Sequence, residues 1–202
     1  MNDQRIFWND RFSREGFFYG MNPNVYVASI IDTLPPRQHI LFLGEGEGRN
    51  ALYAALRGHK VTALDASEIG LEKCKSLAKE AGVEIETEHL YLEEWNPKQH
   101  YNAILSSYLH LPEPLRTNVF SRSIQHLLPD GIFGGEFFSL NQLPKTSGGP
   151  KDPSLLYTVE QLKSILDPLS CAILELKEME TNLQEGAGHN GIASVIRLKV
   201  QA

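Results

Sequence analysis

The sequence predicts an α/β fold: a single domain built on a doubly wound, mainly parallel sheet with helices on both faces. Apolar runs without polar alternation, typical of strands buried on both faces, alternate with segments of helical periodicity. A glycine-rich turn follows the first such run, which is where an open α/β sheet binds its ligands. The 202 residues are enough for one domain with a substantial core.

The expected elements follow from these patterns and from their end signals. The strands are expected at 39–44, 60–65, 83–90, 101–108, 131–139, 171–181 and 192–200. The helices are expected at 25–34, 48–59, 67–82, 112–127 and 158–166. Ser67 and Thr158 are N-cap types, while Gly58 and Gly82 are C-cap types. The loop 182–191 is too short for a parallel crossover, so the last two strands are expected to be antiparallel.

Two segments lie outside this alternation. Residues 1–36 form a polar and aromatic N-terminal cap segment ahead of a catalytic core at 37–202. Residues 141–154 are rich in proline, glycine and serine, which favours a mobile loop that gates or selects a ligand. A disordered surface connection is the alternative for this second segment.

Composition excludes several functional classes. The formal net charge of −6, without a cluster of Lys and Arg, argues against nucleic acid or an anionic membrane as the main partner. No apolar run is long enough to span a bilayer, and the start lacks the apolar core of a signal peptide. Two cysteines without a CxxC pair and seven scattered histidines predict a reduced, cytoplasmic protein without a metal site.

The glycine-rich turn, LGEGEG, predicts a nucleoside site. Gly44 and Gly46 allow the backbone to turn sharply and to approach a ligand closely. Asp65 ends the second strand 21 residues after Gly44 (65 − 44), the spacing of an acid that accepts hydrogen bonds from ribose hydroxyls. The alternative for Asp65 is a helix cap beside Ser67.

Two carboxylates within this turn favour one nucleoside cofactor over another. A dinucleotide site prefers a small residue at the position of Arg49 and places a diphosphate at the helix N-terminus. Glu45 and Glu47 would repel a diphosphate by on the order of 1 kcal/mol at 4–6 Å, but not a cationic sulfonium. The sequence therefore predicts S-adenosylmethionine. The alternative is that both glutamates only stabilise the helix dipole.

The chain resembles the class I S-adenosylmethionine-dependent methyltransferases, and in particular their small bacterial branch described as tellurite-resistance-like. The resemblance is carried by LGEGEGRNALYAALRGHKVTALDAS, and further by WNDRFSREGFFYGMNPN, YLHLP, GGPKDPSLLYTVEQL and EGAGHNGIASVIRL. These motifs occur in the family's order over most of the chain. The resemblance implies a Rossmann-like seven-stranded sheet of order 3-2-1-4-5-7-6 with strand 7 antiparallel.

The resemblance also implies which residues bind the cofactor. Gly44 to Gly46 would pass under the methionine part, Asp65 would take both ribose hydroxyls, and Ser106 would contact the amino group. The implied cofactor-binding set from the core is Gly44, Glu45, Gly46, Asp65, Ala66, Leu92, Glu93 and Ser106. The chain departs from the family pattern at Phe42 and Tyr91, where acids are usual.

The cap segment offers two further cofactor-binding residues. Arg11 and Tyr19 could close over the methionine carboxylate, because a guanidinium binds a carboxylate through two hydrogen bonds. The alternative is that Trp8, Phe12 and Phe17 only fix an N-terminal helix to the core.

Three residues are candidates for contact with the methyl acceptor. His110 follows the fourth strand and could take a proton near neutral pH, or could instead hydrogen-bond the backbone of its turn. His189 lies between the last two strands and is a candidate acceptor-site residue. Tyr157 precedes the Thr158 cap and either contacts the acceptor or packs in the core.

The function expected from the sequence is methyl transfer from S-adenosylmethionine to a small-molecule acceptor. Little of the chain beyond the core remains to hold a macromolecule. The resemblance implies a chalcogen oxyanion such as tellurite or selenite, or another soft nucleophile. An anionic acceptor would require cations at the mouth of the site, for which Arg11, Arg14 and Lys145 are candidates. The alternatives are a nucleoside-binding sensor without catalysis and, disfavoured by the glycine spacing, an NAD-linked oxidoreductase.

Overall fold

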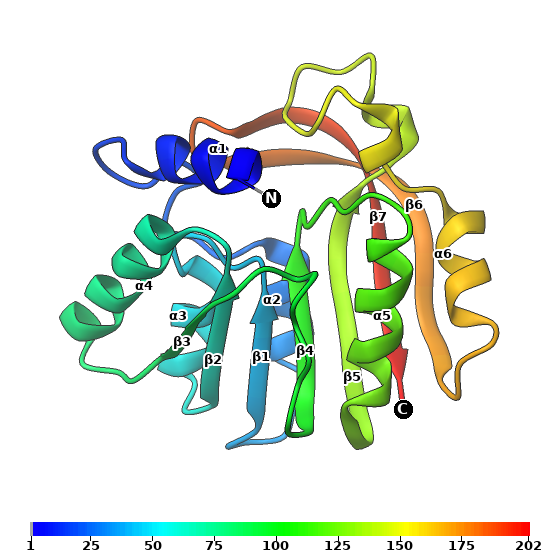
Figure 1. Ribbon diagram of the computed structural model, residues 1–202, viewed down its shortest axis with the longest axis horizontal. Coiled ribbons are helices and arrows are strands. Elements are labelled where there is room, and N and C mark those ends of the chain that lie inside the picture. The colour runs from blue at the N-terminus through cyan, green and yellow to red at the C-terminus, as the bar shows by residue number, and fades with distance from the viewer. Residues whose placement is uncertain (1) are drawn as a thin grey trace.

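The computed structural model describes residues 2–202, and the side chains from Ile6 onward. Its single sheet has the order β3-β2-β1-β4-β5-β7-β6, as the resemblance implied (Figure 1). The first five strands are parallel, and β7 is antiparallel to both of its neighbours. The strands are β1 (His39–Leu43), β2 (Lys60–Asp65), β3 (Glu86–His89), β4 (Tyr101–Ser107), β5 (Leu127–Phe138), β6 (Ala172–Glu185) and β7 (His189–Gln201).

Helices cover both faces of the sheet, as the alternation of strands and helices predicted (Figure 1). The helices are α1 (Asn2–Phe12), α2 (Val25–Ile31), α3 (Arg49–Leu56), α4 (Glu68–Ala81), α5 (Leu115–Gln125) and α6 (Val159–Leu166). Short 3-10 turns lie at Leu140–Gln142 and Pro153–Leu155. Because successive side chains of β1 point to opposite faces, Leu41 and Leu43 pack with α5 and α6, while Ile40 and Phe42 pack with α2 and α3.

The predicted caps Ser67, Gly82 and Thr158 are confirmed, whereas α2 and α5 are shorter than the helices expected at 25–34 and 112–127. The Ser67 hydroxyl accepts a hydrogen bond from the Gly70 amide and begins α4, and Gly82 ends it with a left-handed φ of 68°. Thr158 begins α6 with a reciprocal pair of hydrogen bonds to Gln161, a capping box. These local signals are strong because they satisfy amides that a helix leaves unpaired.

The prediction of a loop at 182–191 is wrong. Pairing between β6 and β7 continues from Asn182 opposite Ile192 to Glu185 opposite His189, which leaves only residues 186–188 as the connection. The polar residues of this stretch resemble a loop in sequence, but Glu185 and His189 are buried against other polar groups. The hairpin therefore extends beyond the sheet, where the Ala187 amide donates to the Phe18 carbonyl (2.9 Å).

The segment 141–154 is anchored to β7 in the structure. The buried Gln142 side chain accepts from the Ser194 amide (2.8 Å) and donates to the Ser147 hydroxyl (3.0 Å). Ser147 in turn donates to the Ile192 carbonyl (2.8 Å). The segment thus has a defined path at one wall of the site, and its movement stays a prediction.

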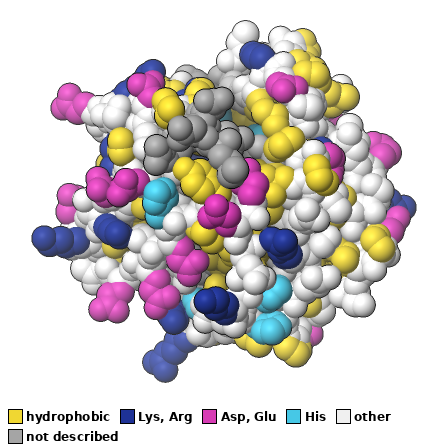
Figure 2. All heavy atoms as spheres, in the orientation of Figure 1, with side chains coloured by type: hydrophobic (Ala, Val, Ile, Leu, Met, Phe, Trp, Pro, Cys, Tyr) yellow, Lys and Arg dark blue, Asp and Glu magenta, His cyan; other side chains and the backbone are white. Residues whose placement is uncertain are grey.

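Surface charge is mixed on the face that Figure 2 shows, where Lys and Arg side chains are interspersed with Asp and Glu. Within residues 2–202, no helix has the length and apolar character that crossing a bilayer requires. Among the side chains that the structure describes, from Ile6 onward, no cluster of His, Cys, Asp and Glu is suited to a metal ion.

Candidate active site

A cavity of about 540 Å³ lies beyond the carboxyl ends of β1, β2, β4 and β5, with the N-terminal segment over it. This volume falls in the range of small-molecule sites. Of the residues predicted to act here, the cavity is lined by Arg11, Tyr19, Gly44, Glu45, Gly46, Asp65, Ala66, Leu92, Glu93, His110 and His189. Ser106 and Tyr157 do not line it.

The glycine turn forms the floor of this cavity. Gly44 and Gly46 both have left-handed φ values, 65° and 63°. A Cβ at Gly44 would lie 2.9 Å from Leu109 Cδ1, and one at Gly46 would lie 2.9 Å from Phe12 Cζ. Glycine is needed here for its backbone conformation and for the close approach of the neighbouring side chains, and it keeps the floor open to a ligand.

Asp65 is held beside the turn with its carboxylate fixed. Oδ2 accepts from the Gly46 amide (2.8 Å), and Oδ1 accepts from the Ser67 amide (2.7 Å). Each oxygen keeps a further lone pair, so two more donors can be accepted. Burial raises the pKa of this carboxyl to about 6, although the amides of Ser67 and Gly46 oppose the rise. A pair of ribose hydroxyls would supply donors to this buried carboxylate.

The two glutamates of the turn do not point at a ligand with free carboxylates. Glu45 Oε1 accepts from the amides of Asn50 (2.7 Å) and Ala51 (2.8 Å), so it caps the first turn of α3. Burial raises its pKa to about 7 despite these hydrogen bonds. Glu47 accepts from the Phe18 amide (2.8 Å) and from Lys73 Nζ (2.8 Å). The alternative stated for these glutamates, a role at the helix N-terminus, therefore describes Glu45, and Glu47 fixes the N-terminal segment.

The far end of the cavity is walled by the residues that follow β2 and β3. Ala66, Leu92 and Glu93 line it, as expected for an adenine subsite. Tyr91, which replaces the usual acid of the family, also lines it and offers an aromatic face. The ring of His89 contacts the Ala66 carbonyl (3.1 Å) and holds this wall to β2.

The side chain of Ser106, predicted to contact the methionine amino group, does not line the cavity. Its hydroxyl donates to the Leu43 carbonyl (3.0 Å) between β4 and β1, and the side chain is buried. Alternation along β4 instead directs Ser107 to the cavity, where its hydroxyl accepts from Asn50 Nδ2 (3.1 Å). Ser107 thus presents its side chain to the cavity in place of Ser106.

Arg11 and Tyr19 form one side of the cavity mouth. Arg11 Nη1 donates to the Tyr19 hydroxyl (2.9 Å), and its guanidinium lies over the ring of Phe7 (4.5 Å to the centroid). Trp8 stacks on Phe12 with centroids 5.6 Å apart. Both features expected for this segment are therefore present. Aromatic residues pack α1 against the core, and this packing places the Arg11 guanidinium at the cavity.

His110 lacks the features of a general base. Its Nδ1 donates to the Leu155 carbonyl (2.7 Å), and Nε2 accepts from the Phe138 amide (3.4 Å). Burial lowers its pKa to about 3. Since both ring nitrogens are engaged with backbone groups, the structure favours the alternative that His110 shapes its turn, and the prediction of a proton acceptor at this position is corrected.

The prediction of Tyr157 as an acceptor contact is also wrong. The ring is fully buried between Phe137 and the Arg116 guanidinium. Its hydroxyl donates to the Leu109 carbonyl (2.8 Å) and accepts from the Leu111 amide (2.8 Å). Burial raises the pKa of the Tyr157 hydroxyl above its usual value. Tyr157 thus fixes the turn after β4 from beneath.

Tyr157→Phe tests this structural role. The change leaves the Leu111 amide and the Leu109 carbonyl without a partner, so we expect a loss of about 1–2 kcal/mol in the free energy of unfolding. Urea titration of the variant and the parent protein measures it. Cofactor affinity should stay within about twofold; an unchanged stability together with lost turnover would restore a chemical role for the hydroxyl.

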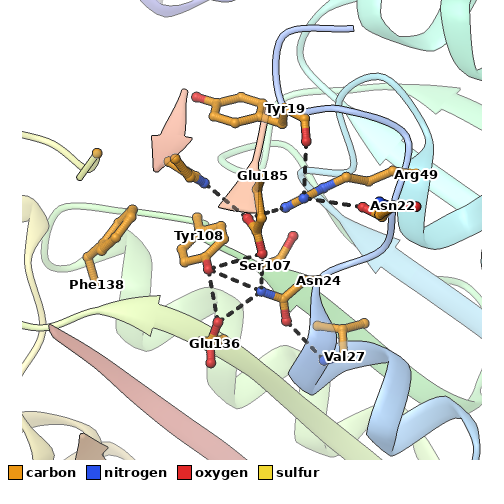
Figure 3. A network of polar contacts seen from close by, with 12 residues as sticks. Tyr19, Asn22, Asn24, Val27, Arg49, Ser107, Tyr108, Glu136, Phe138 and Glu185 are labelled. Atoms are coloured by element: carbon orange, nitrogen blue, oxygen red, sulfur yellow. Dashed lines mark hydrogen bonds and ion pairs between the residues drawn. The ribbon is translucent and has the colours of Figure 1, made fainter. Parts of the chain in front are cut away.

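His189 contacts a polar network that was not predicted from the sequence, and Figure 3 shows its members Glu185, Arg49 and Asn24. Its Nδ1 contacts Glu185 Oε2 (3.2 Å), and Arg49 Nη2 contacts the same oxygen (2.8 Å). Asn24 Nδ2 donates to Glu185 Oε1 (3.0 Å) and to Glu136 Oε1 (2.9 Å). The network joins the hairpin, the N-terminal segment and α3. The sequence feature that could have indicated this network is Arg49, because a charged residue at the start of a buried helix needs a partner of opposite charge.

Comparison with known proteins agrees with this geometry. Residues 40–131 match the protein family described as "Methyltransferase domain". No curated protein sequence matches the chain. The fold is similar to that of TehB from Haemophilus influenzae, with a TM-score of 0.71 and 17% identity over 98% of this chain and 66% of that one.

Two further solved structures share the fold over nearly the whole chain. The N-methyltransferase NodS from Bradyrhizobium japonicum, in complex with S-adenosyl-L-homocysteine, gives a TM-score of 0.72 at 10% identity and covers 98% of this chain and 97% of its own. Magnesium protoporphyrin IX methyltransferase from Synechocystis with bound S-adenosylmethionine gives 0.69 at 16% identity, with 99% and 95% covered.

These similarities confirm the predicted fold, and residues 40–131 match a methyltransferase domain, the kind of domain that the resemblance implied. Solved structures of this fold hold S-adenosylmethionine or its demethylated product, as predicted for the cofactor. Assignment to the tellurite-resistance-like branch stays a prediction.

Proposed function

We propose that the protein transfers a methyl group from S-adenosylmethionine to a small-molecule acceptor. The observation that carries the proposal is the placing of the Asp65 carboxylate beside the Gly44–Gly46 turn in one cavity of about 540 Å³. This pairing suits a nucleoside without phosphate, because a glycine floor admits the ligand's chain and a fixed carboxylate accepts from its sugar.

The residues present fit this cofactor along the length of the cavity. Ala66 and Leu92 would flank the adenine, and Asp65 would accept from both ribose hydroxyls. The guanidinium of Arg11 would pair with the methionine carboxylate at the mouth. When bound, the cofactor supplies an electrophilic methyl group on a cationic sulfur. The protein's task is then to align the acceptor and to exclude water.

The acceptor is proposed to be small, with a soft nucleophilic atom. The resemblance to the tellurite-resistance-like branch supports a chalcogen oxyanion such as tellurite or selenite as one member of this class. The cavity wall beside Tyr108 and Phe138 is aromatic, which supports a soft, weakly charged acceptor as another. Of the three cations named from the sequence, Arg11 lines the cavity, whereas Arg14 and Lys145 do not.

Cofactor affinity should depend on the ionisation of Asp65. Ribose hydroxyls donate to the ionised carboxylate, whereas the pKa of this group in the free protein is about 6. Protonated protein must therefore lose a proton to bind, so the Kd should rise as the pH falls through about 6, approaching tenfold per pH unit below it. Calorimetric titration at pH 5, 6, 7 and 8 measures this slope.

Asp65→Asn should remove that slope, because the variant has no proton to lose at this position. Glu45→Gln is the matched control, since Glu45 also has a raised pKa but is bound to amides of α3. A slope that persists in Asp65→Asn would assign the pH dependence to another group.

The function itself is tested by binding and turnover together. Isothermal titration should show saturable binding of S-adenosylmethionine and of S-adenosylhomocysteine, and no comparable binding of NADH. A radiolabelled methyl group should then move to one of a panel comprising tellurite, selenite, iodide and small thiols. Tight binding without transfer to any acceptor would favour the sensor, and saturable binding of NADH alone would favour the oxidoreductase.

A further inference from the structure

We propose that Glu185 is a positioning residue that holds the His189 ring with Nε2 bare toward the cavity, and that the acceptor is a small uncharged molecule carrying a protonated soft nucleophile, namely a thiol. The proposal rests on the methyl transfer proposed above. It names the acceptor class and the proton acceptor of the same site.

The geometry of the pair fixes the tautomer of His189. Glu185 Oε2 lies 3.2 Å from Nδ1, and a carboxylate can only accept, so Nδ1 carries the hydrogen. Among the described residues, the ring makes its hydrogen bond through Nδ1 and none through Nε2, and the ring lines the cavity. A neutral imidazole in this state presents a basic nitrogen to whatever lies there.

Glu185 is itself held rigidly, which distinguishes it from a surface partner. His189 contacts Oε2. Arg49 contacts the same oxygen, and Asn24 donates to Oε1 (3.0 Å), as Figure 3 shows. Burial would raise the pKa of Glu185, but the His189 ring and the Arg49 guanidinium hold it below its usual value. The carboxylate is thus ionised, oriented and shielded from solvent, as a positioning group must be.

The charged groups around His189 leave it neutral near pH 7. Burial lowers its pKa, the Glu185 carboxylate opposes this, and Arg49 and Arg11 add to the lowering. The other titratable neighbours are the Tyr19 and Tyr108 rings, with centroids 4.5 and 4.3 Å away. His110, whose pKa is about 3, brings no charge.

The charge of the cavity disfavours an anionic acceptor. Two arginines, Arg11 and Arg49, line it together with the carboxylates of Asp65 and Glu93. Arg49 is already paired with Glu185. An oxyanion would therefore lose its hydration without gaining an unpaired cation beside His189. An uncharged molecule would pay a much smaller desolvation free energy on entering the cavity.

The wall beside His189 suits sulfur. The rings of Tyr108 and Phe138 are stacked with centroids 4.6 Å apart, and each has its centroid within 5.0 Å of the His189 ring centroid. Thioethers and thiols make favourable contacts with aromatic rings. A small thiol can thus lie against these rings with its S–H directed at Nε2.

The chemical step balances without another reactant. The thiol proton passes to His189 Nε2, and the sulfur electron pair forms the new S–CH₃ bond as the bond between the methyl carbon and the cofactor sulfur breaks. The products are a methyl thioether and S-adenosylhomocysteine. The imidazolium, paired with Glu185, then releases its proton to solvent.

The first test needs no acceptor and no cofactor. Nitrogen-15 NMR of the histidine side chains in the full chain, assigned with His189→Gln, should show His189 as the Nδ1–H tautomer. In Glu185→Gln, the pKa of His189 should fall by about one unit, because the opposing carboxylate is gone; Glu185→Asp should restore part of it. A wild-type His189 protonated on Nε2, or a pKa unmoved in Glu185→Gln, overturns the positioning role.

The second test measures transfer from S-adenosylmethionine to 2-mercaptoethanol, which is protonated at pH 7, and to thiophenol, which is largely ionised. His189→Gln should lower kcat with 2-mercaptoethanol by about 10²- to 10⁴-fold and lower that with thiophenol much less. His100→Gln, at an exposed histidine outside the cavity, is the matched control. Equal losses for the two thiols, or no loss, overturn the proton acceptor.

Failure of the inference is separable from failure of the proposed function. If the wild-type protein binds S-adenosylmethionine but methylates neither thiol, the acceptor class is wrong and the methyl transfer proposal stands. If it does not bind S-adenosylmethionine at all, the proposed function fails, while the NMR result still decides the pairing of Glu185 with His189.

Discussion

Asp65→Ala is expected to weaken S-adenosylmethionine binding by about 1.5–3 kcal/mol, a factor of roughly 10 to 150 in Kd. Asp65 lies in the cavity with both carboxylate oxygens already fixed by the amides of Gly46 and Ser67. Its remaining lone pairs are therefore preorganised, and their loss would leave two ribose hydroxyls without an acceptor. Isothermal titration of S-adenosylhomocysteine, which shares the sugar, gives the same comparison without turnover.

Two variants separate loss of this acceptor from damage to the fold. Asp65→Asn keeps one oxygen acceptor and the size of the side chain, so it should fall between alanine and the parent. Asp167→Ala, at an exposed aspartate that ends α6, should bind like the parent. Unchanged affinity in a folded Asp65→Ala variant would remove the sugar from this place in the cavity.

Gly48→Ala is expected to destabilise the protein by about 2–5 kcal/mol. Gly48 begins α3 with φ of 96°, a conformation that costs an L-residue about 1–2 kcal/mol. Its new Cβ would also lie 2.6 Å from Cys74 Sγ and 2.8 Å from Cys74 Cα, in the contact between α3 and α4. Overpacking of this kind adds about 1–3 kcal/mol. Urea unfolding monitored by circular dichroism measures the sum.

Gly58→Ala is the matched control for this prediction. Gly58 has a similar left-handed φ of 78°, but a Cβ there would meet nothing within 4 Å. The variant should therefore show the backbone cost alone, about 1–2 kcal/mol. If both variants lost the same stability, the contact between α3 and α4 would contribute nothing, and the close packing of the turn would not explain the third glycine.

The architecture was largely predictable because it depends on local patterns. Buried strands such as β1 need apolar side chains on both faces, and the caps Ser67 and Thr158 mark helix starts independently of tertiary contacts. The hairpin of β6 and β7 was not predictable in this way. Glu185 and His189 have loop-like polarity, and only their buried partners, which lie far away in sequence, keep them in paired strands.

In the candidate site, too, the residues placed by local sequence patterns were predicted, and those that depend on distant contacts were not. Gly44, Gly46 and Asp65 were identified because backbone conformation and strand ends place them from local sequence alone. Ser106 was displaced by Ser107 because a shift of one residue along β4 exchanges the two faces. Sequence spacing fixes which turn a residue lies in, but not which way its side chain points.

Side-chain networks account for the remaining differences. Tyr157 was a candidate because it precedes a helix near the site, but its hydroxyl is used between Leu109 and Leu111. The pairing of Glu185 with Arg49 was not predicted because the two residues lie far apart in the sequence. The two glutamates of the glycine turn also have partners that the sequence did not reveal. Glu45 accepts from amides of α3, and Glu47 pairs with Lys73.

The most direct measurement is a crystal structure of the protein with S-adenosylhomocysteine. The ribose hydroxyls should lie within about 3 Å of the Asp65 carboxylate oxygens, with the homocysteine chain over Gly44 and Gly46 and the sulfur facing the side of the cavity that holds His189. A cavity that closes on its own side chains, or a nucleoside bound with its sugar away from Asp65, would contradict the assignment.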